Sequence, residues 1–187
     1  AVVFEHADPG SLRPRAHPWT DAEADPSHRY HDLRASPALI RSALEDFVGW
    51  STYPAIETFY RLLEWLNGPG SVFESNDCAF VGPAVDASGA STKCLGCSGR
   101  VMILYRDLAT NTSKREVRAL AQGIARAAQR VDPSWEWGAL GITITSVVFT
   151  TLPGPAARQR GEQLMLSFWA WGDDEAEVMA RLDRTLA

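Results

Sequence analysis

The sequence predicts a single domain with an α+β fold, and three observations lead to this prediction. Segments with helical apolar spacing and segments of extended character follow one another in the order ααββαββα. The chain has 187 residues, enough for one domain with a core. Its composition, 45% hydrophobic and 22% charged, is typical of a globular protein. About four largely antiparallel strands, packed with helices, would bury every apolar face.

Residues 1–35 differ from the rest of the chain. They contain four of the eleven prolines, all four histidines and no apolar periodicity. Because proline interrupts both helices and central strands, we expect an irregular or extended N-terminal arm here. The α+β domain is expected to occupy residues 36–187.

The first half of this domain is expected to hold two helices and two strands. A helix begins at Ser36-Pro37 and ends near Gly49, and a second runs from about Pro54 to Asn67. Residues 71–82 predict a strand with an unusually polar centre. A Gly-, Ser- and Ala-rich loop is expected at 82–99, followed by an apolar strand at 100–106.

The second half begins with the clearest helix of the sequence. Ser113 and Glu116 form a capping-box pattern, and the helix ends at Asp132-Pro133. Residues 139–152 and 162–171 predict two strands of a long-looped antiparallel hairpin. A last helix is opened by a second capping-box pattern, Asp174 with Glu177.

The net charge and the absence of known motifs exclude several classes of function. A net charge of −5 argues against nucleic acid or an anionic membrane as a partner, and no apolar run reaches the length of a membrane span. An odd number of cysteines, three, favours the cytoplasm as the default location. No phosphate-binding loop, dinucleotide fingerprint or hydrolase elbow is present, so no cofactor is expected.

Cys94 and Cys97 form a Cys-x-x-Cys motif. A redox pair of the thioredoxin kind needs a helix N-terminus, and the motif instead precedes a predicted strand. A structural zinc ion needs four ligands, and only Cys78 and an arm histidine remain to supply the others. A disulfide that includes Cys78 is a further alternative. A structural or adventitious role is favoured, and no metal site is expected.

A polar cluster interrupts the strand predicted at 71–82. Regular alternation would place Glu74, Asn76 and Cys78 on one side and Ser75 and Asp77 on the other. The next strand supplies partners for the carboxylates, Arg100 and Arg106. The cluster is interpreted as a buried ionic network, and an acid–base site is the alternative.

Two sets of residues are candidates for a binding surface. Paired tryptophans, each pair on one face of an extended chain, occur as Trp135 with Trp137 and Trp169 with Trp171. A basic stripe on the helix after Ser113 comprises Arg115, Arg118, Arg126 and Arg130. The alternative for the tryptophans is packing against the sheet. The alternative for the arginines is an ordinary solvated helix face.

These observations favour an acidic binding protein of the inhibitor or accessory type, which acts through a protein partner. The alternative is a small enzyme or ligand-binding domain with a polar pocket over the sheet. That pocket would use Glu74, Asp77, Cys78, Arg100 and Arg106, with the loop 82–99 as its lid. The sequence indicates no oligomeric state.

Overall fold

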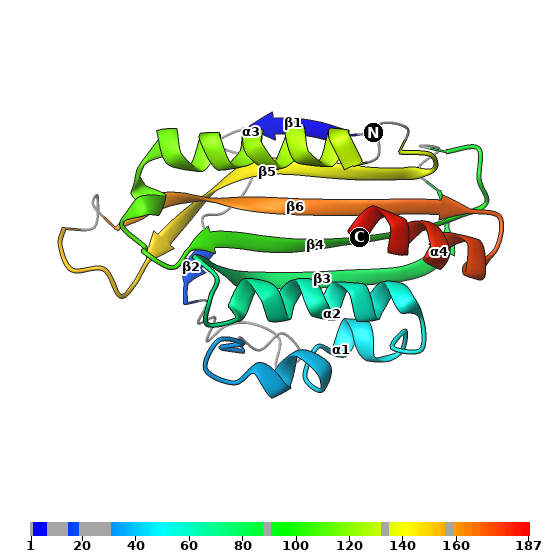
Figure 1. Ribbon diagram of the computed structural model, residues 1–187, viewed down its shortest axis with the longest axis horizontal. Coiled ribbons are helices and arrows are strands. Elements are labelled where there is room, and N and C mark those ends of the chain that lie inside the picture. The colour runs from blue at the N-terminus through cyan, green and yellow to red at the C-terminus, as the bar shows by residue number, and fades with distance from the viewer. Residues whose placement is uncertain (1, 7–14, 19–30, 88–90, 132–134, 156–158) are drawn as a thin grey trace.

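A mixed six-stranded sheet forms the centre of the computed structural model, which describes residues 2–6, 15–18, 31–87, 91–131, 135–155 and 159–187 (Figure 1). Four long strands lie antiparallel in the order β5-β6-β4-β3. They are β3 (Phe73–Val85), β4 (Leu95–Tyr105), β5 (Gly138–Phe149) and β6 (Arg160–Gly172). Two short strands, β1 (Val2–His6) and β2 (Arg15–His17), pair parallel with β5 one after the other.

The α+β class and the four antiparallel strands agree with the prediction, whereas the two short strands were not predicted. β1 and β2 come from the proposed arm and occupy the edge of the sheet. They have five and three residues, too few to show a period in the sequence. The other residues of the arm up to residue 30, apart from Pro18, lie outside the described residues.

The loop expected at 82–99 is too long, because half of that range, residues 82–85 and 95–99, belongs to β3 and β4. A Cβ on Gly96 would lie 3.0 Å from the ring of Trp171, and one on Gly99 would lie 2.4 Å from the ring of Phe168. These glycines leave room for aromatic rings on β6. The small residues that suggested a loop are therefore strand positions beneath large neighbours.

Three of the four α-helices follow the predicted pattern. They are α2 (Pro54–Asn67), α3 (Lys114–Val131) and α4 (Glu175–Leu186). Ser113 Oγ accepts a hydrogen bond from the Glu116 N–H at 3.4 Å, and Asp174 Oδ1 accepts one from the Glu177 N–H at 2.8 Å. Both predicted N-caps are thereby confirmed.

The first predicted helix is divided in two. A 3₁₀ helix, η1 (Pro37–Arg41), precedes the short α1 (Glu45–Val48). The Ser42 hydroxyl donates to the Ala38 carbonyl, and Leu44 has a non-helical backbone conformation. The continuous helix expected from Ser36 is therefore wrong at its centre.

The helices pack on one face of the sheet in two groups (Figure 1). α1, α2 and α4 bury Phe47, Phe59 and Val178 together with Phe80 and Phe168 of the strands. α3 packs over β1, β5 and β6 and forms a smaller core. Among the described residues, no helix packs on the opposite face, which is called the helix-free face below. No helix in this part of the chain is long and apolar enough to cross a membrane.

The two edges of the sheet approach each other at one end, which we call the rolled end. Asn76 Nδ2 of β3 donates to the carbonyl of Ala16 in β2 at 3.3 Å and to Gln163 Oε1 of β6 at 3.1 Å. In Figure 1, the end of β5 runs down toward β2, which lies near the adjoining ends of β3 and β4. Val147 and Phe149 are fully buried at this end, where the ring of Phe149 and the backbone of Asn111 both lie over Gly161.

Candidate functional site

A pocket with a volume of about 580 Å³ opens at the rolled end. It lies where β2, residues 32–35, the end of α2, the start of β3 and the segment after β4 meet. Its polar lining consists of His17, Asp32, Arg34, Asn67, Glu74, Ser75, Arg106 and Thr151. The volume falls in the range of small-molecule sites in proteins.

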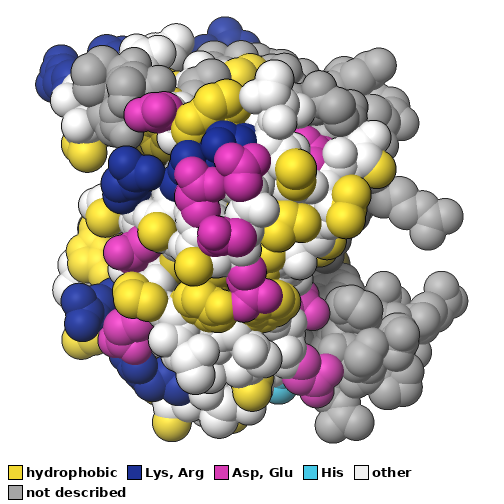
Figure 2. All heavy atoms as spheres, turned by 90° about the vertical axis from the view of Figure 1, so that its right-hand side faces the viewer, with side chains coloured by type: hydrophobic (Ala, Val, Ile, Leu, Met, Phe, Trp, Pro, Cys, Tyr) yellow, Lys and Arg dark blue, Asp and Glu magenta, His cyan; other side chains and the backbone are white. Residues whose placement is uncertain are grey.

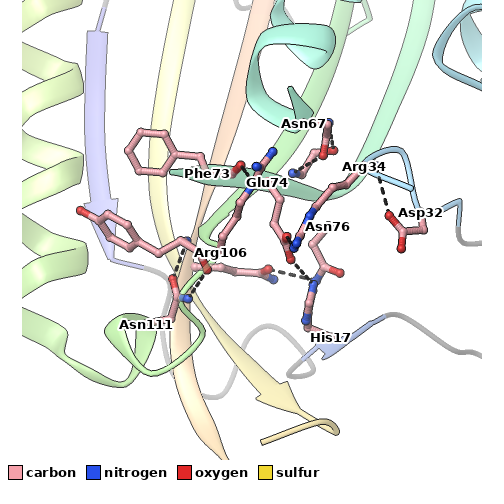
Figure 3. Close-up of polar contacts among 12 residues, drawn as sticks. His17, Asp32, Arg34, Asn67, Phe73, Glu74, Asn76, Arg106 and Asn111 are labelled. Atoms are coloured by element: carbon pink, nitrogen blue, oxygen red, sulfur yellow. Dashed lines mark hydrogen bonds and ion pairs between the residues drawn. The ribbon is translucent and has the colours of Figure 1, made fainter. Parts of the chain in front are cut away.

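Glu74 is the central charged group of this pocket, and its side chain is only 11% exposed. His17 Nε2 lies 2.8 Å from Glu74 Oε1, and Arg34 Nη1 lies 3.3 Å from Glu74 Oε2 (Figure 3). Both carboxylate oxygens therefore have a donor, which compensates the carboxylate for its loss of water. His17 Nδ1 is buried and has no partner among the described residues.

Arg106 fixes the wall of the pocket to the end of α2. Its guanidinium donates to the carbonyl oxygens of Gly68 at 2.6 Å, Phe73 at 2.9 Å and Leu66 at 3.4 Å. Carbonyls at a helix C-terminus lack partners within the helix and attract positive charge. The charge of Arg106 thus lies at a position set by the backbone.

Asn67 joins the same helix end to β3. Its Nδ2 donates to Ser75 Oγ at 2.9 Å, and its Oδ1 accepts from the Ser75 N–H at 3.2 Å.

The opposite wall is a turn in which Asp32 Oδ1 accepts the N–H groups of Arg34 and Ala35. The turn holds the backbone of Arg34 where its side chain reaches Glu74 (Figure 3).

The five residues of the predicted catalytic pocket lie in three places. Glu74 and Arg106 line the pocket described above. Asp77 and Arg100 form an ion pair of 3.3 Å on the helix-free face. Cys78 packs against the helix-side core, and burial raises the pKa of its thiol to about 12.

A β-bulge explains this separation. The register between β3 and β4 shifts between Ser75 and Asp77, so regular alternation stops at that point. Asn76 points into the rolled end and bonds Gln163, whereas Cys78 points toward the helices. The expectation that Glu74, Asn76 and Cys78 share one side is therefore wrong.

The Cys-x-x-Cys motif is divided between two environments. Cys94 is exposed and precedes β4, whereas Cys97 is buried within that strand, where burial raises the pKa of its thiol to about 12. All three cysteines, Cys78 included, are free thiols. In the part of the chain that the structure describes, no three His, Cys, Asp or Glu side chains are grouped to hold a metal ion.

The paired tryptophans are half-buried. Trp169 and Trp171 lie on the helix-free face, where their rings cover Gly141 and Gly96. Trp135 and Trp137 have left-handed φ angles of 44° and 56°, so they are not extended and do not form the expected paired face. This geometry fits packing at the end of the sheet.

Trp137 also has two cations over its ring. Lys93 Nζ lies 5.2 Å and Arg181 Cζ lies 5.6 Å from the ring centroid. Lys93 Nζ also contacts Asp173 Oδ2 at 2.5 Å. Figure 2 shows acidic side chains gathered on this end of the molecule, where α4 begins. Acidic groups at a helix N-terminus stabilise the helix, so this cluster has a structural explanation.

One exposed aromatic surface was missed by the sequence reasoning. Trp65, near the end of α2, is 60% exposed, and Val72 is 61% exposed. The rings of Trp65 and Phe73 are 6.2 Å apart, and those of Phe73 and Tyr105 are 5.1 Å apart. These four residues are called the Trp65 surface below. The sequence contained a signal for this exposure, because Trp65 lies outside the apolar stripe of its helix.

The four arginines of the predicted basic stripe are exposed on α3. They are Arg115, Arg118, Arg126 and Arg130. His17 and Arg34 of the pocket were not predicted, because both belong to the arm and lie far from Glu74 in sequence. Comparison of the chain with known protein families, curated proteins and solved structures finds no match.

Proposed function

We propose that this chain is a binding protein that acts through a protein partner, and that the partner docks on the Trp65 surface. The observation that carries the proposal is the exposure of Trp65. Among the large hydrophobic side chains that are exposed in the described part of the chain, Trp65 alone is aromatic. Tryptophan is enriched among the residues that contribute most to binding energy at protein interfaces.

The surroundings of Trp65 support this role. Phe73 and Tyr105 lie behind it on adjacent strands, so the aromatic surface rests on the sheet. A rigid surface loses little conformational freedom on binding, which favours affinity. The exposed ring of Trp65 continues into the half-buried rings of Phe73 and Tyr105, and apolar surface of this kind is typical of interaction sites.

Charged groups of α2 and of the end of η1 form ion pairs along the helix that carries Trp65. Arg41 Nη1 lies 2.6 Å from Glu57 Oε2, and Arg41 Nε lies 2.8 Å from Glu64 Oε1. Arg61, four positions before Trp65, also contacts Glu57. An apolar centre with a polar rim is the usual organisation of a protein interface.

The alternative of a small enzyme has less support. The one thiol of its five pocket residues, Cys78, lies on the helix side of the sheet with a raised pKa, whereas Glu74 lines the pocket. A thiol with a pKa of about 12 is almost fully protonated at neutral pH and is a poor nucleophile. We therefore place the function in binding.

Affinity measurements on a Trp65 variant test the proposal. The tagged chain is used to capture partners from the cells in which it is native, and the partner is purified. Its affinity is then measured by calorimetry for the unchanged chain, for Trp65→Ala and for Val85→Ala, an exposed apolar control. Trp65→Ala should weaken binding by about 30-fold or more, and Val85→Ala should leave it unchanged.

Two results would contradict the proposal. One is an unchanged affinity of Trp65→Ala, with its fold verified by circular dichroism. The other is the absence of any partner that binds the purified chain directly.

A further inference from the structure

We infer that the pocket at the rolled end binds a small organic anion, which presents a carboxylate or phosphate group to Arg34 and Arg106. This inference concerns a different site from the Trp65 surface and does not depend on a protein partner. It rests on the unused hydrogen-bonding groups of the pocket, on the fixed position of Arg106 and on the pocket's volume.

The acceptors of the pocket are largely occupied. Both oxygens of Glu74 have donors, from His17 and from Arg34. Asp32 uses Oδ1 to hold its own turn. A cationic ligand at Glu74 would therefore have to displace Arg34 or His17, which makes a cation unfavourable at this carboxylate.

The donors, by contrast, are in excess. In the described part of the chain, Arg34 uses only Nη1 among its guanidinium nitrogens, and Arg106 leaves Nη1 without a partner. The Ser75 hydroxyl accepts from Asn67, and no described residue accepts its proton. Free donors from two guanidinium groups match the oxygens of a carboxylate or a phosphate.

The two arginines differ in mobility, which suits capture of a ligand. Arg106 is held by three backbone carbonyls, so its charge is preorganised. The side chain of Arg34 is 57% exposed. Its 3.3 Å contact with Glu74 is longer than the contact between His17 and Glu74. Arg34 can turn toward an anion while His17 retains Glu74 at 2.8 Å.

The remaining lining indicates that the anion carries a small carbon skeleton. Leu33 and Leu108 form an apolar part of the lining. A volume of about 580 Å³ exceeds what a bare inorganic anion fills. We therefore expect an organic carboxylate or phosphate ester rather than a simple ion.

Titration of the full chain with two probe anions tests this inference. Calorimetry with citrate and with inorganic phosphate, at constant ionic strength against chloride, distinguishes the carboxylate from the phosphate class. Binding of either probe supports the site and names its class. If neither binds more tightly than chloride, the inference is overturned.

Variants locate the binding. Arg34→Gln should lower the affinity about tenfold or more, because it removes a charge-assisted hydrogen bond. Arg115→Gln makes the same change on α3 and should have no effect. Equal losses in both variants would indicate non-specific attraction and overturn the site. Arg34→Lys keeps the charge without the guanidinium and should bind with intermediate affinity, which provides a second measurement if Arg34→Gln folds poorly.

The two proposals can fail separately. Trp65→Ala should retain anion binding, and Arg34→Gln should retain the protein partner. In NMR spectra, the amide signals of Ser75 and Leu108 should shift on addition of the anion. Shifts confined to α3 would place the anion on the basic stripe and refute the pocket.

Discussion

The reactivity of the three cysteines tests the environments assigned to the Cys-x-x-Cys motif. Burial raises the pKa values of Cys78 and Cys97 to about 12. At pH 8, about one molecule in 10⁴ of such a thiol is the reactive thiolate, compared with roughly a quarter of an ordinary thiol with a pKa of 8.5. Each buried cysteine therefore presents roughly two thousandfold less thiolate than an ordinary thiol, so it should react far more slowly, and limited access slows it further.

Reaction with the thiol reagent DTNB measures this difference. The folded chain should show one fast thiol, Cys94, which is the exposed one, and all three should react once the chain is unfolded. Cys94→Ser should abolish the fast phase, and Cys97→Ser should leave it intact. The matched pair separates the two positions of the motif without altering its spacing.

Two fast thiols in the folded chain would refute this assignment. So would a disulfide between Cys94 and Cys97 in protein purified without reductant, because a buried strand position should not oxidise readily. Either result would restore the redox interpretation of the motif. One equivalent of retained zinc would likewise restore the metal interpretation.

Two further predictions concern stability. Asn111 is buried and satisfies both the N–H and the carbonyl of Tyr105, so Asn111→Ala should lower the free energy of unfolding by about 2–4 kcal/mol in denaturant titrations. A loss below about 1 kcal/mol would show that water replaces the amide. Arg41 lowers the pKa of Glu57 from 4.5 to about 2, so the stability from this pair is complete above pH 4.5 and is lost as the pH falls toward 2. The difference in unfolding free energy between the unchanged chain and Glu57→Gln should disappear across that interval, and a difference independent of pH would contradict the pairing.

The elements with local signals were predictable from the sequence. α2, α3 and α4 combine apolar spacing with recognisable ends, and the hairpin of β5 and β6 shows alternation. Each of these signals lies within a single helix or strand and its immediate flanks. Local patterns were therefore sufficient for the class of fold and for most of its elements.

The features that depend on distant contacts were not predictable. Gly99 belongs to a strand because it faces Phe168, and no local pattern reveals that partner. The bulge beside Asn76 reverses the side of Cys78, and a bulge has no reliable mark in a single sequence. The candidate site was affected most, since two of its charged residues come from an arm without periodicity.

The origin of these residues has a consequence for the pocket. His17 and Arg34 come from the arm, whereas Glu74 and Arg106 belong to the domain. Without the arm, Glu74 would lose both donors, and a buried carboxylate without partners is strongly unfavourable. Docking of the arm and burial of Glu74 therefore depend on each other.

This dependence links the arm to the proposed ligand. An anion that contacts Arg34 and Arg106 joins one group of the arm to one group of the domain, so it binds only when both are in place. A ligand that binds one arrangement in preference to another stabilises that arrangement by mass action. Occupation of the pocket should accordingly strengthen the attachment of the arm, and the arm is a component of the site rather than an appendage to the fold.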